Sequence, residues 1–283
     1  MAQQRNGSVV RRRILARRLR LLREQAGLTL EEAAPKLDWS AASLSRIETA
    51  QQGVDVHGVR SMLDLYDVGG DRWTDLIELT RQARQRGWWQ AYGLGQPPFY
   101  VGYETEASLV YEFTVGYVPG LLQTADYARA LFTAVPMRRT EEQLANEVTV
   151  RMIRQHRLTS TDHPLRLVAV VDETVLHRPV GGSEVLGAQL RHLAEAAILD
   201  TVTLQVLPTA VGAHAALASG FTILNFGDLG EPDIAYVEHS LGALILDKEH
   251  DVTRARLAFD RVRADALDPA ESLAMVRRLA EQA

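Results

Sequence analysis

The feature that most constrains the fold of this chain is a pair of short predicted helices near its N-terminus. Gly27 is placed to end a preceding helix, because glycine most easily takes the left-handed conformation found there. Thr29 and Glu32 have the spacing of a capping box, which predicts that a helix begins just after Thr29. Pro35 lies beyond the first turn and predicts that this helix is short or bent. Ser40 then follows a tight connection and is placed to cap a second short helix.

The side chains of these two helices allow them to cross closely. Ala33 and Ala34 are small, while Leu44 and Ile47 form an apolar inner face on the second helix. Further helices are predicted over about residues 10–25, 56–66 and 71–86. Two short helices joined by a turn of about three residues are typical of a helix-turn-helix, so the sequence predicts an all-α, five-helix domain over residues 1–86.

The outer face of the second short helix is predicted to lie against DNA. Small residues at a helix N-terminus let the backbone enter a major groove, and arginine offers the paired donors that suit guanine. Arg46 is therefore the predicted base-reading residue. The complete predicted DNA-binding set, which includes two arginines of the first helix that would contact phosphate, is Arg12, Arg17, Thr29, Ser40, Ala41, Ala42, Ser43, Ser45 and Arg46.

The charge of the chain is distributed unevenly. The net charge is −5, yet residues 1–90 hold 15 Lys and Arg against 11 Asp and Glu, and the remaining 193 residues hold 16 against 25. A basic module beside an acidic one indicates a polyanion partner for the first. On charge alone, an arginine-rich solvated helix face is the alternative interpretation.

Residues 87–105 are predicted to be a linker or junction. They include Trp88 and Trp89, which are typical of a covered domain junction, and then Gly93, Gly95 and Pro97-Pro98, which break the helical pattern. Residues 106–283 mix strand-like apolar runs with helical segments. The sequence therefore predicts a multi-domain protein whose second part is an α+β regulatory or dimerisation domain with five or six strands.

The segment from Leu28 to Glu48, with "LTLEEAAPKL" and "SAASLSRIE", resembles the DNA-binding domain of Xre/Cro-type regulators. The resemblance implies that Arg23 and Glu48 form a buried structural ion pair. It also implies that the chain regulates transcription.

The C-terminal part is similar to a domain of unknown function in actinobacterial Xre-type regulators. The motif that carries the resemblance is Val118-Pro119-Gly120-Leu121-Leu122-Gln123-Thr124, followed in order by Arg151-x-x-Arg154-Gln155 and Gln205-Val206-Leu207-Pro208. Some members of that family are antitoxin-like and are encoded beside a small toxin-like protein. The resemblance therefore implies a small partner protein for this domain.

Little in the sequence points to catalysis. The chain has no cysteine, which excludes a thiol nucleophile and any Cys-ligated metal site. Asp172 and Glu173 are expected to be neighbours on a strand, pointing to opposite faces, so they would not form a catalytic dyad. His192 and Glu195 share a helix face but have no third ligand nearby in sequence. We expect no catalytic residue, no metal site and no cofactor, and the chain is not predicted to be an enzyme.

Three functions remain open. The first is a sequence-specific regulator that binds double-stranded DNA as a homodimer and binds a small partner protein, encoded nearby, through its C-terminal domain. The second is the same regulator with a C-terminal sensor for a small-molecule effector. The third, an enzyme with a DNA-targeting domain, is disfavoured because no catalytic constellation is visible.

The location of the protein is also predicted from its sequence. The longest stretch without Asp, Glu, Lys or Arg covers residues 201–227, but it contains Pro208 and Gly212 and is predicted to be two strands around a loop. No membrane association is expected, and no apolar leader follows the N-terminal arginines. We expect a cytoplasmic, nucleoid-associated protein.

Overall fold

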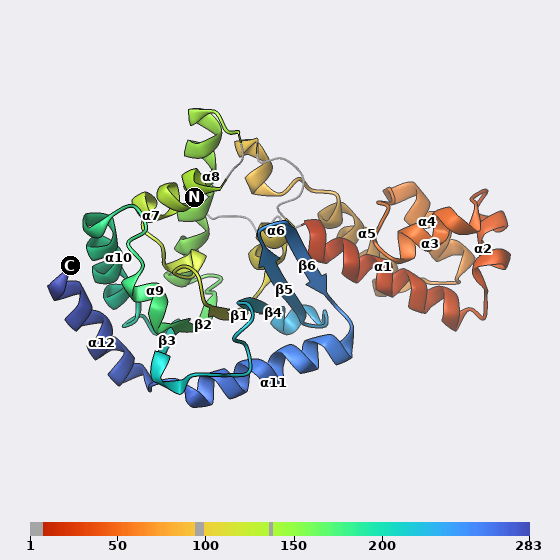
Figure 1. The fold of residues 1–283 in the computed structure, drawn as a ribbon. Coiled ribbons are helices and arrows are strands. Elements are labelled where there is room, and N and C mark those ends of the chain that lie inside the picture. Colours follow the sequence, from red (N-terminus) through yellow and green to blue (C-terminus); the bar gives the residue numbers. More distant parts are fainter. Residues whose placement is uncertain (1–7, 94–98, 136–137) are drawn as a thin grey trace. The chain divides into compact units, whose positions relative to one another are not determined.

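The computed structural model describes residues 8–93, 99–135 and 138–283. The chain divides into two compact units, one over Met1–Gln90 and Gln96–Glu106 and the other over Ala91–Gly95 and Ala107–Ala283 (Figure 1). The first unit is helical and the second contains the sheet. The predicted layout, a helix-turn-helix domain followed by an α+β domain, is confirmed.

Three helices of the first unit, α2, α3 and α4, begin where the sequence supplies a capping side chain. Thr29, Ser40 and Asp55 each accept a hydrogen bond from a backbone N–H of the helix that follows. Pro35 lies inside a helix of only 7 residues, in agreement with the predicted short helix. The helices are α1 (Ser8–Gln25), α2 (Leu30–Lys36), α3 (Ala41–Glu48), α4 (Val56–Leu65), α5 (Gly70–Ala83) and α6 (Phe99–Glu106).

The first unit has its own apolar core. Leu19 of α1, Leu44 of α3 and Met62 of α4 are completely buried there. Ala33 is also completely buried, so a side chain of one carbon lets α2 approach α3 closely. These helices therefore pack around a single core, which sets the direction of α3.

The stretch predicted as a linker contains regular structure. A 3-10 helix covers Trp88–Tyr92, and α6 begins at Phe99. Residues 94–98, which include the predicted breakers Gly95 and Pro97-Pro98, lie outside the described residues. The Trp89 side chain is buried, and the Trp88 indole N–H donates to Thr105 Oγ1 at 3.2 Å. Arg11 of α1 also pairs with Glu106 of α6, at 3.2 Å between Nε and Oε1. The tryptophans and α6 are thus part of the first unit.

The second unit is built on a mixed sheet whose spatial order is β3-β2-β1-β4-β5-β6. β1, β2 and β3 are parallel neighbours, whereas β1 pairs with β4, β4 with β5 and β5 with β6 in antiparallel fashion. β2 is apolar on both faces, as expected of a central parallel strand. The strands are β1 (Leu109–Thr114), β2 (Arg166–Asp172), β3 (Val202–Leu207), β4 (Phe221–Asn225), β5 (Ile234–His239) and β6 (Gly242–Leu246).

Helices cover the sheet. Phe259 and Val262 of one long helix, α11, are completely buried against Phe113 and Ile223 on one face, and α7, α8 and α10 lie on the other side (Figure 1). The helices are α7 (Ala125–Ala134), α8 (Glu141–Gln155), α9 (Glu173–His177), α10 (Ser183–Ala196), α11 (Glu249–Asp265) and α12 (Pro269–Gln282). Short 3-10 helices cover Gly120–Leu122, His156–Leu158, Thr209–Val211 and Gly227–Leu229.

The predicted arrangement of Asp172 and Glu173 is wrong. Asp172 ends β2 and its carboxylate accepts from the Thr174 N–H at 2.9 Å, so it caps α9. Glu173 is the first residue of α9 and accepts hydrogen bonds from the N–H and hydroxyl of Thr209, at 2.8 and 2.9 Å. A helix start that needs a cap therefore takes over where the strand was expected to continue.

The uncharged stretch at residues 201–227 contains β3 and β4, as predicted, but these strands are not neighbours in the sheet. No helix among the described residues is long and apolar enough to cross a membrane.

Candidate nucleic-acid interface

The helix predicted to read DNA, α3, is fixed at its start by Ser40. The Ser40 hydroxyl oxygen accepts a hydrogen bond from the Ser43 N–H at 3.1 Å. Leu44 and Ile47 are buried in the core, so the opposite face of α3 is directed outward. The Ser40 cap and the buried residues together determine which side chains of α3 are available to contact DNA.

The predicted residues of α3 are not equally available. Ser40, Ala42 and Arg46 are exposed, and Ser43 and Ser45 are half-buried. Ala41 packs partly against the core. The outward face is therefore narrow, and its one long side chain is Arg46.

Gln52 extends this face, and the sequence analysis missed it. The Arg46 Nε donates to Gln52 Oε1 at 3.1 Å, and the Gln52 Nε2 donates to Ser43 Oγ at 3.3 Å. The Gln52 N–H also donates to the Arg46 carbonyl oxygen at 3.0 Å, which keeps the residue close to the end of α3. The polar run Gln51-Gln52-Gly53 just after a predicted recognition helix is the signal that could have found it.

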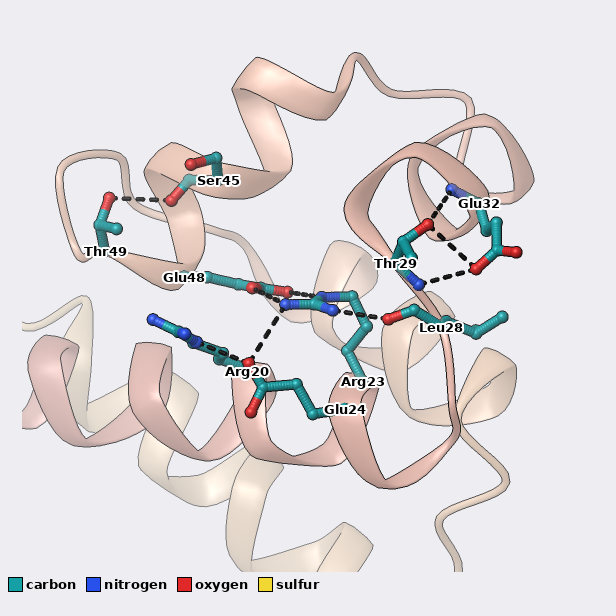
Figure 2. Close-up of polar contacts among 9 residues, drawn as sticks. All are labelled: Arg20, Arg23, Glu24, Leu28, Thr29, Glu32, Ser45, Glu48 and Thr49. Carbon is teal, nitrogen blue, oxygen red and sulfur yellow. Dashed lines mark hydrogen bonds and ion pairs between the residues drawn. The ribbon is translucent and has the colours of Figure 1, made fainter.

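Arg23 of α1 and Glu48, the last residue of α3, form a bidentate ion pair on the buried side of α3 (Figure 2). Arg23 Nε donates to Glu48 Oε1 at 2.8 Å, and Arg23 Nη2 donates to Glu48 Oε2 at 2.9 Å. The third nitrogen, Nη1, donates to the Leu28 carbonyl oxygen at 2.6 Å. Only 8% of the Arg23 side chain and 3% of the Glu48 side chain are exposed. The pair thus joins the end of α1 to the end of α3 and to the segment before α2.

The electrostatics around this pair agree with its burial. The hydrogen bond that Arg23 donates to Glu48 raises the pKa of Arg23, so the guanidinium stays charged. Burial, with a smaller contribution from the Glu48 carboxylate, raises the pKa of Tyr66 to about 12. Charge-assisted, two-pronged bonds are strongly directional, and they fix the angle between α1 and α3.

Thr29 has a local role. Its hydroxyl oxygen accepts from the Glu32 N–H at 3.2 Å, and its own N–H donates to Glu32 Oε2 at 2.8 Å (Figure 2). These bonds complete the capping box of α2. The predicted contact of Thr29 with DNA stays a prediction beside this observed role.

Arg12 and Arg17 lie on different sides of α1. Five residues of an α-helix turn through about 140° beyond a full circle, so the two side chains do not share one face. Arg12 lines a small hollow together with Ile47 and Gln52, at the end of α3. Of the two, Arg12 is therefore the one that the structure places near Gln52 at the end of α3.

The chemistry of this face suits duplex DNA. A guanidinium can donate two hydrogen bonds to guanine, and an amide can both donate to and accept from adenine in the major groove. Within residues 8–93, 99–135 and 138–283, no three His, Asp or Glu side chains gather as a metal site would require.

Fold and geometry define a helix-turn-helix protein, and the comparison with known families agrees. Residues 14–76 match a helix-turn-helix domain, which indicates a DNA-binding regulator. Residues 99–278 match the domain of unknown function DUF5753, and because this match spans more than half of the chain, the protein belongs to that family. No curated protein and no solved structure matches the chain.

Proposed function

We propose that this protein is an Xre/Cro-type transcriptional regulator that reads a specific duplex DNA sequence through α3. The observation that carries the proposal is the arrangement of α3. The Arg23–Glu48 pair holds its buried side, while Arg46, Gln52 and Ser43 form one hydrogen-bonded group on its outward side.

Each part of this face has a task in the proposed complex. Arg46 donates to the O6 and N7 atoms of a guanine, and Gln52 either orients Arg46 or contacts the neighbouring base. The small residues Ser40, Ala41, Ala42 and Ser43 let the start of α3 approach the DNA backbone. Arg12 and Arg17 contact phosphates, which adds affinity without sequence preference.

The proposal includes the assembly and the partners of the protein. A single helix-turn-helix reads few base pairs, so we propose a homodimer that binds two half-sites about one DNA turn apart. The family resemblance supports an antitoxin-like, nucleoid-associated regulator whose C-terminal domain binds a small partner protein encoded nearby. In this proposal the protein is not an enzyme.

Binding-site selection from a pool of random duplexes tests the proposal. The selected site should hold a guanine that Arg46→Ala no longer prefers, with a loss of about 1–3 kcal/mol in binding free energy. Arg81→Ala is the matched control, because Arg81 is exposed on α5 and pairs with Glu78 at 3.2 Å. Selection that yields no consensus, or a preference at every position that Arg46→Ala leaves unchanged, contradicts the proposed reading face.

A second experiment separates a protein partner from a small-molecule effector. The proposed small partner protein, if one is encoded beside this chain, is purified with it, and the two should elute as one complex. If they do not, and a metabolite extract instead shifts the melting temperature of the chain, the C-terminal domain is a ligand sensor.

A further inference from the structure

The two edge strands of the sheet, β3 and β6, differ in whether their outer backbone groups are hydrogen-bonded. β3 is covered along its outer edge: the Val206 N–H donates to Ser272 Oγ at 2.9 Å, and the Val206 carbonyl oxygen accepts from the Leu267 N–H at 2.9 Å. The Gln205 side chain also donates to the Leu267 carbonyl oxygen at 2.8 Å. The connection between α11 and α12, with the start of α12, thus occupies the backbone groups of this edge.

β6 forms the opposite edge, and among the described residues no backbone hydrogen bond is made to its outer side. Ser240 and Leu241 form a two-residue turn between His239 and Gly242, which are paired. In a two-residue hairpin the closing pair exchanges both backbone hydrogen bonds, and the pattern alternates along an antiparallel ladder. Gly242, Leu244 and Leu246 therefore bond to β5, while Ala243 and Ile245 direct their N–H and C=O groups away from the sheet.

The side chains of β6 include none of the features that usually prevent an edge strand from pairing with another strand. Residues 240–246 contain no charged residue and no proline. Leu241 is 93% exposed and Leu244 is 52% exposed. Natural proteins usually protect an open edge with lysine, proline, a bulge or a covering element. Within the described chain, the outward backbone groups of Ala243 and Ile245 have no such protection.

We propose that β6 pairs with β6 of a second copy of this chain, in antiparallel fashion, around a twofold axis at Leu244. This inference rests on the proposed function for the need of two copies and names the surface that joins them. Ala243 of each copy then faces Ile245 of the other, and each of these pairs exchanges two backbone hydrogen bonds. The two sheets continue as one across the interface.

The strand is complementary to itself in this register. Leu244 faces Leu244 of the second copy at a position without backbone hydrogen bonds, where opposing side chains lie closest together. Both leucines, half-exposed in the single chain, become covered. No like charges meet over residues 240–246, because the segment has none. The pairing uses both outward-facing residues of the strand, which a register centred on Ala243 or Ile245 does not.

Charge exchange at Leu244 tests the proposal, because this residue would face its own copy. Sedimentation of the full-length chain at micromolar concentration should show a dimer. Leu244→Glu and Leu244→Lys should each weaken the dimer by roughly tenfold or more, since like charges then oppose each other. An equimolar mixture of the two variants should restore the dimer.

Ala243→Pro gives an independent test. Proline removes the outward N–H of Ala243 while leaving the bonds of Gly242 and Leu244 to β5, so the dimer should be lost. Ala243→Thr, which keeps the N–H, should stay dimeric. Circular dichroism identifies any variant that fails to fold. If Ala243→Pro fails to fold, the Leu244→Glu and Leu244→Lys variants test the proposal instead.

Several outcomes overturn the proposal. A monomeric parent chain does so, as does a dimer that survives Ala243→Pro and both charge variants. A dimer broken by the charge variants but not restored by mixing them contradicts the twofold register. If the chain is monomeric and β6 instead pairs with a strand of a different protein, the proposed pairing of two copies is wrong. Titration of random-sequence duplexes separates this result from a failure of DNA binding, since a monomer with an intact first unit still binds DNA with a salt-dependent affinity.

Discussion

The two units of this protein bury polar groups for different purposes. In the first unit one of the buried polar groups is a charged pair, Arg23 with Glu48, which lies directly behind an exposed helix face. In the second unit two neutral amides, Gln123 and Gln189, are completely buried. The difference indicates that one network orients a surface, while the other holds the interior of its own domain.

The network around these two amides holds the segment Val118–Thr124 and includes the Arg151 guanidinium. Gln189 accepts from the Thr124 N–H and donates to the Leu122 carbonyl oxygen, both at 2.7 Å. Gln123 donates to the Val118 carbonyl oxygen and accepts from Arg151 Nη1, both at 2.6 Å. Every partner in this group lies inside the second unit, so the motif that carries the family resemblance has a structural role here.

Gly120 shows how closely this segment is packed. A Cβ atom at Gly120 would lie 3.1 Å from Arg151 Nη1 and 3.4 Å from Arg154 Nη2, so only glycine fits without moving the guanidinium groups. The glycine of the motif is explained by close approach alone.

The largest predicted effect is the loss of the charged pair. Glu48→Gln leaves the buried Arg23 charge uncompensated and should destabilise the first unit by about 3–5 kcal/mol. Hydrogen exchange of the α1 and α3 amides measures this change in the intact chain. Glu24→Gln is the matched control: Glu24 Oε1 lies 3.7 Å from Arg23 Nη2, but its side chain is 43% exposed, so little should change. Equal protection in Glu48→Gln and the parent contradicts the assigned role of the pair.

Breaking the amide network should cost more stability than changing an exposed amide, but less than breaking the Arg23–Glu48 ion pair. Gln189→Met preserves volume but leaves the Thr124 N–H and the Leu122 C=O unpaired, and it should cost about 1–3 kcal/mol. This loss of stability is measured by urea unfolding, and hydrogen exchange of the α7 and α10 amides shows where it occurs. Gln282→Met, at an exposed position of α12, should leave stability unchanged. A loss as large as that of Glu48→Gln would remove the contrast between the two units.

Removing the α2 cap should have a smaller effect. Thr29→Ala removes the hydroxyl that accepts from the Glu32 N–H and should destabilise the first unit by about 1 kcal/mol. Thr29→Ser keeps the hydroxyl and should restore stability, as a denaturant titration would show. If Thr29→Ala changes DNA affinity but not stability, the hydroxyl acts on DNA and not on α2.

The smallest predicted effect is a pH dependence shared by both units. The Thr29 N–H lowers the pKa of Glu32, and the Thr209 N–H lowers the pKa of Glu173. Both folded pKa values lie below the ordinary value of 4.5, so both carboxylates stabilise the fold above that pH and lose their contribution as the pH falls through the folded values. Glu173→Gln should reduce the acid dependence of the second unit, measured by thermal unfolding between pH 6 and about 3. An unchanged acid profile contradicts the role given to Thr209.

The sequence predicts the two units unequally well, and the reason is physical. Helix starts at Thr29 and Ser40 depend on side chains within three residues, so local patterns place them correctly. The sheet depends on distant partners: β3 and β4 follow each other along the chain, yet β2 and β1 lie between them. Gln52 was missed because its role arises from a turn that brings its amide back to Arg46. Which edge of the sheet is covered could not be predicted either, because the cover of β3 comes from Ser272 of α12, which is distant in sequence.

The central claim, that Arg46 reads a guanine in the major groove, is tested most directly by changing one atom of the DNA. Replacing each guanine of the selected site in turn by 7-deazaguanine removes the N7 acceptor and leaves the base pair intact. The parent chain should lose affinity at one guanine, whereas Arg46→Ala should bind the natural and the modified site equally at that position. The result that would contradict the account is a loss that is the same in Arg46→Ala as in the parent chain, or no guanine whose N7 matters to the parent chain.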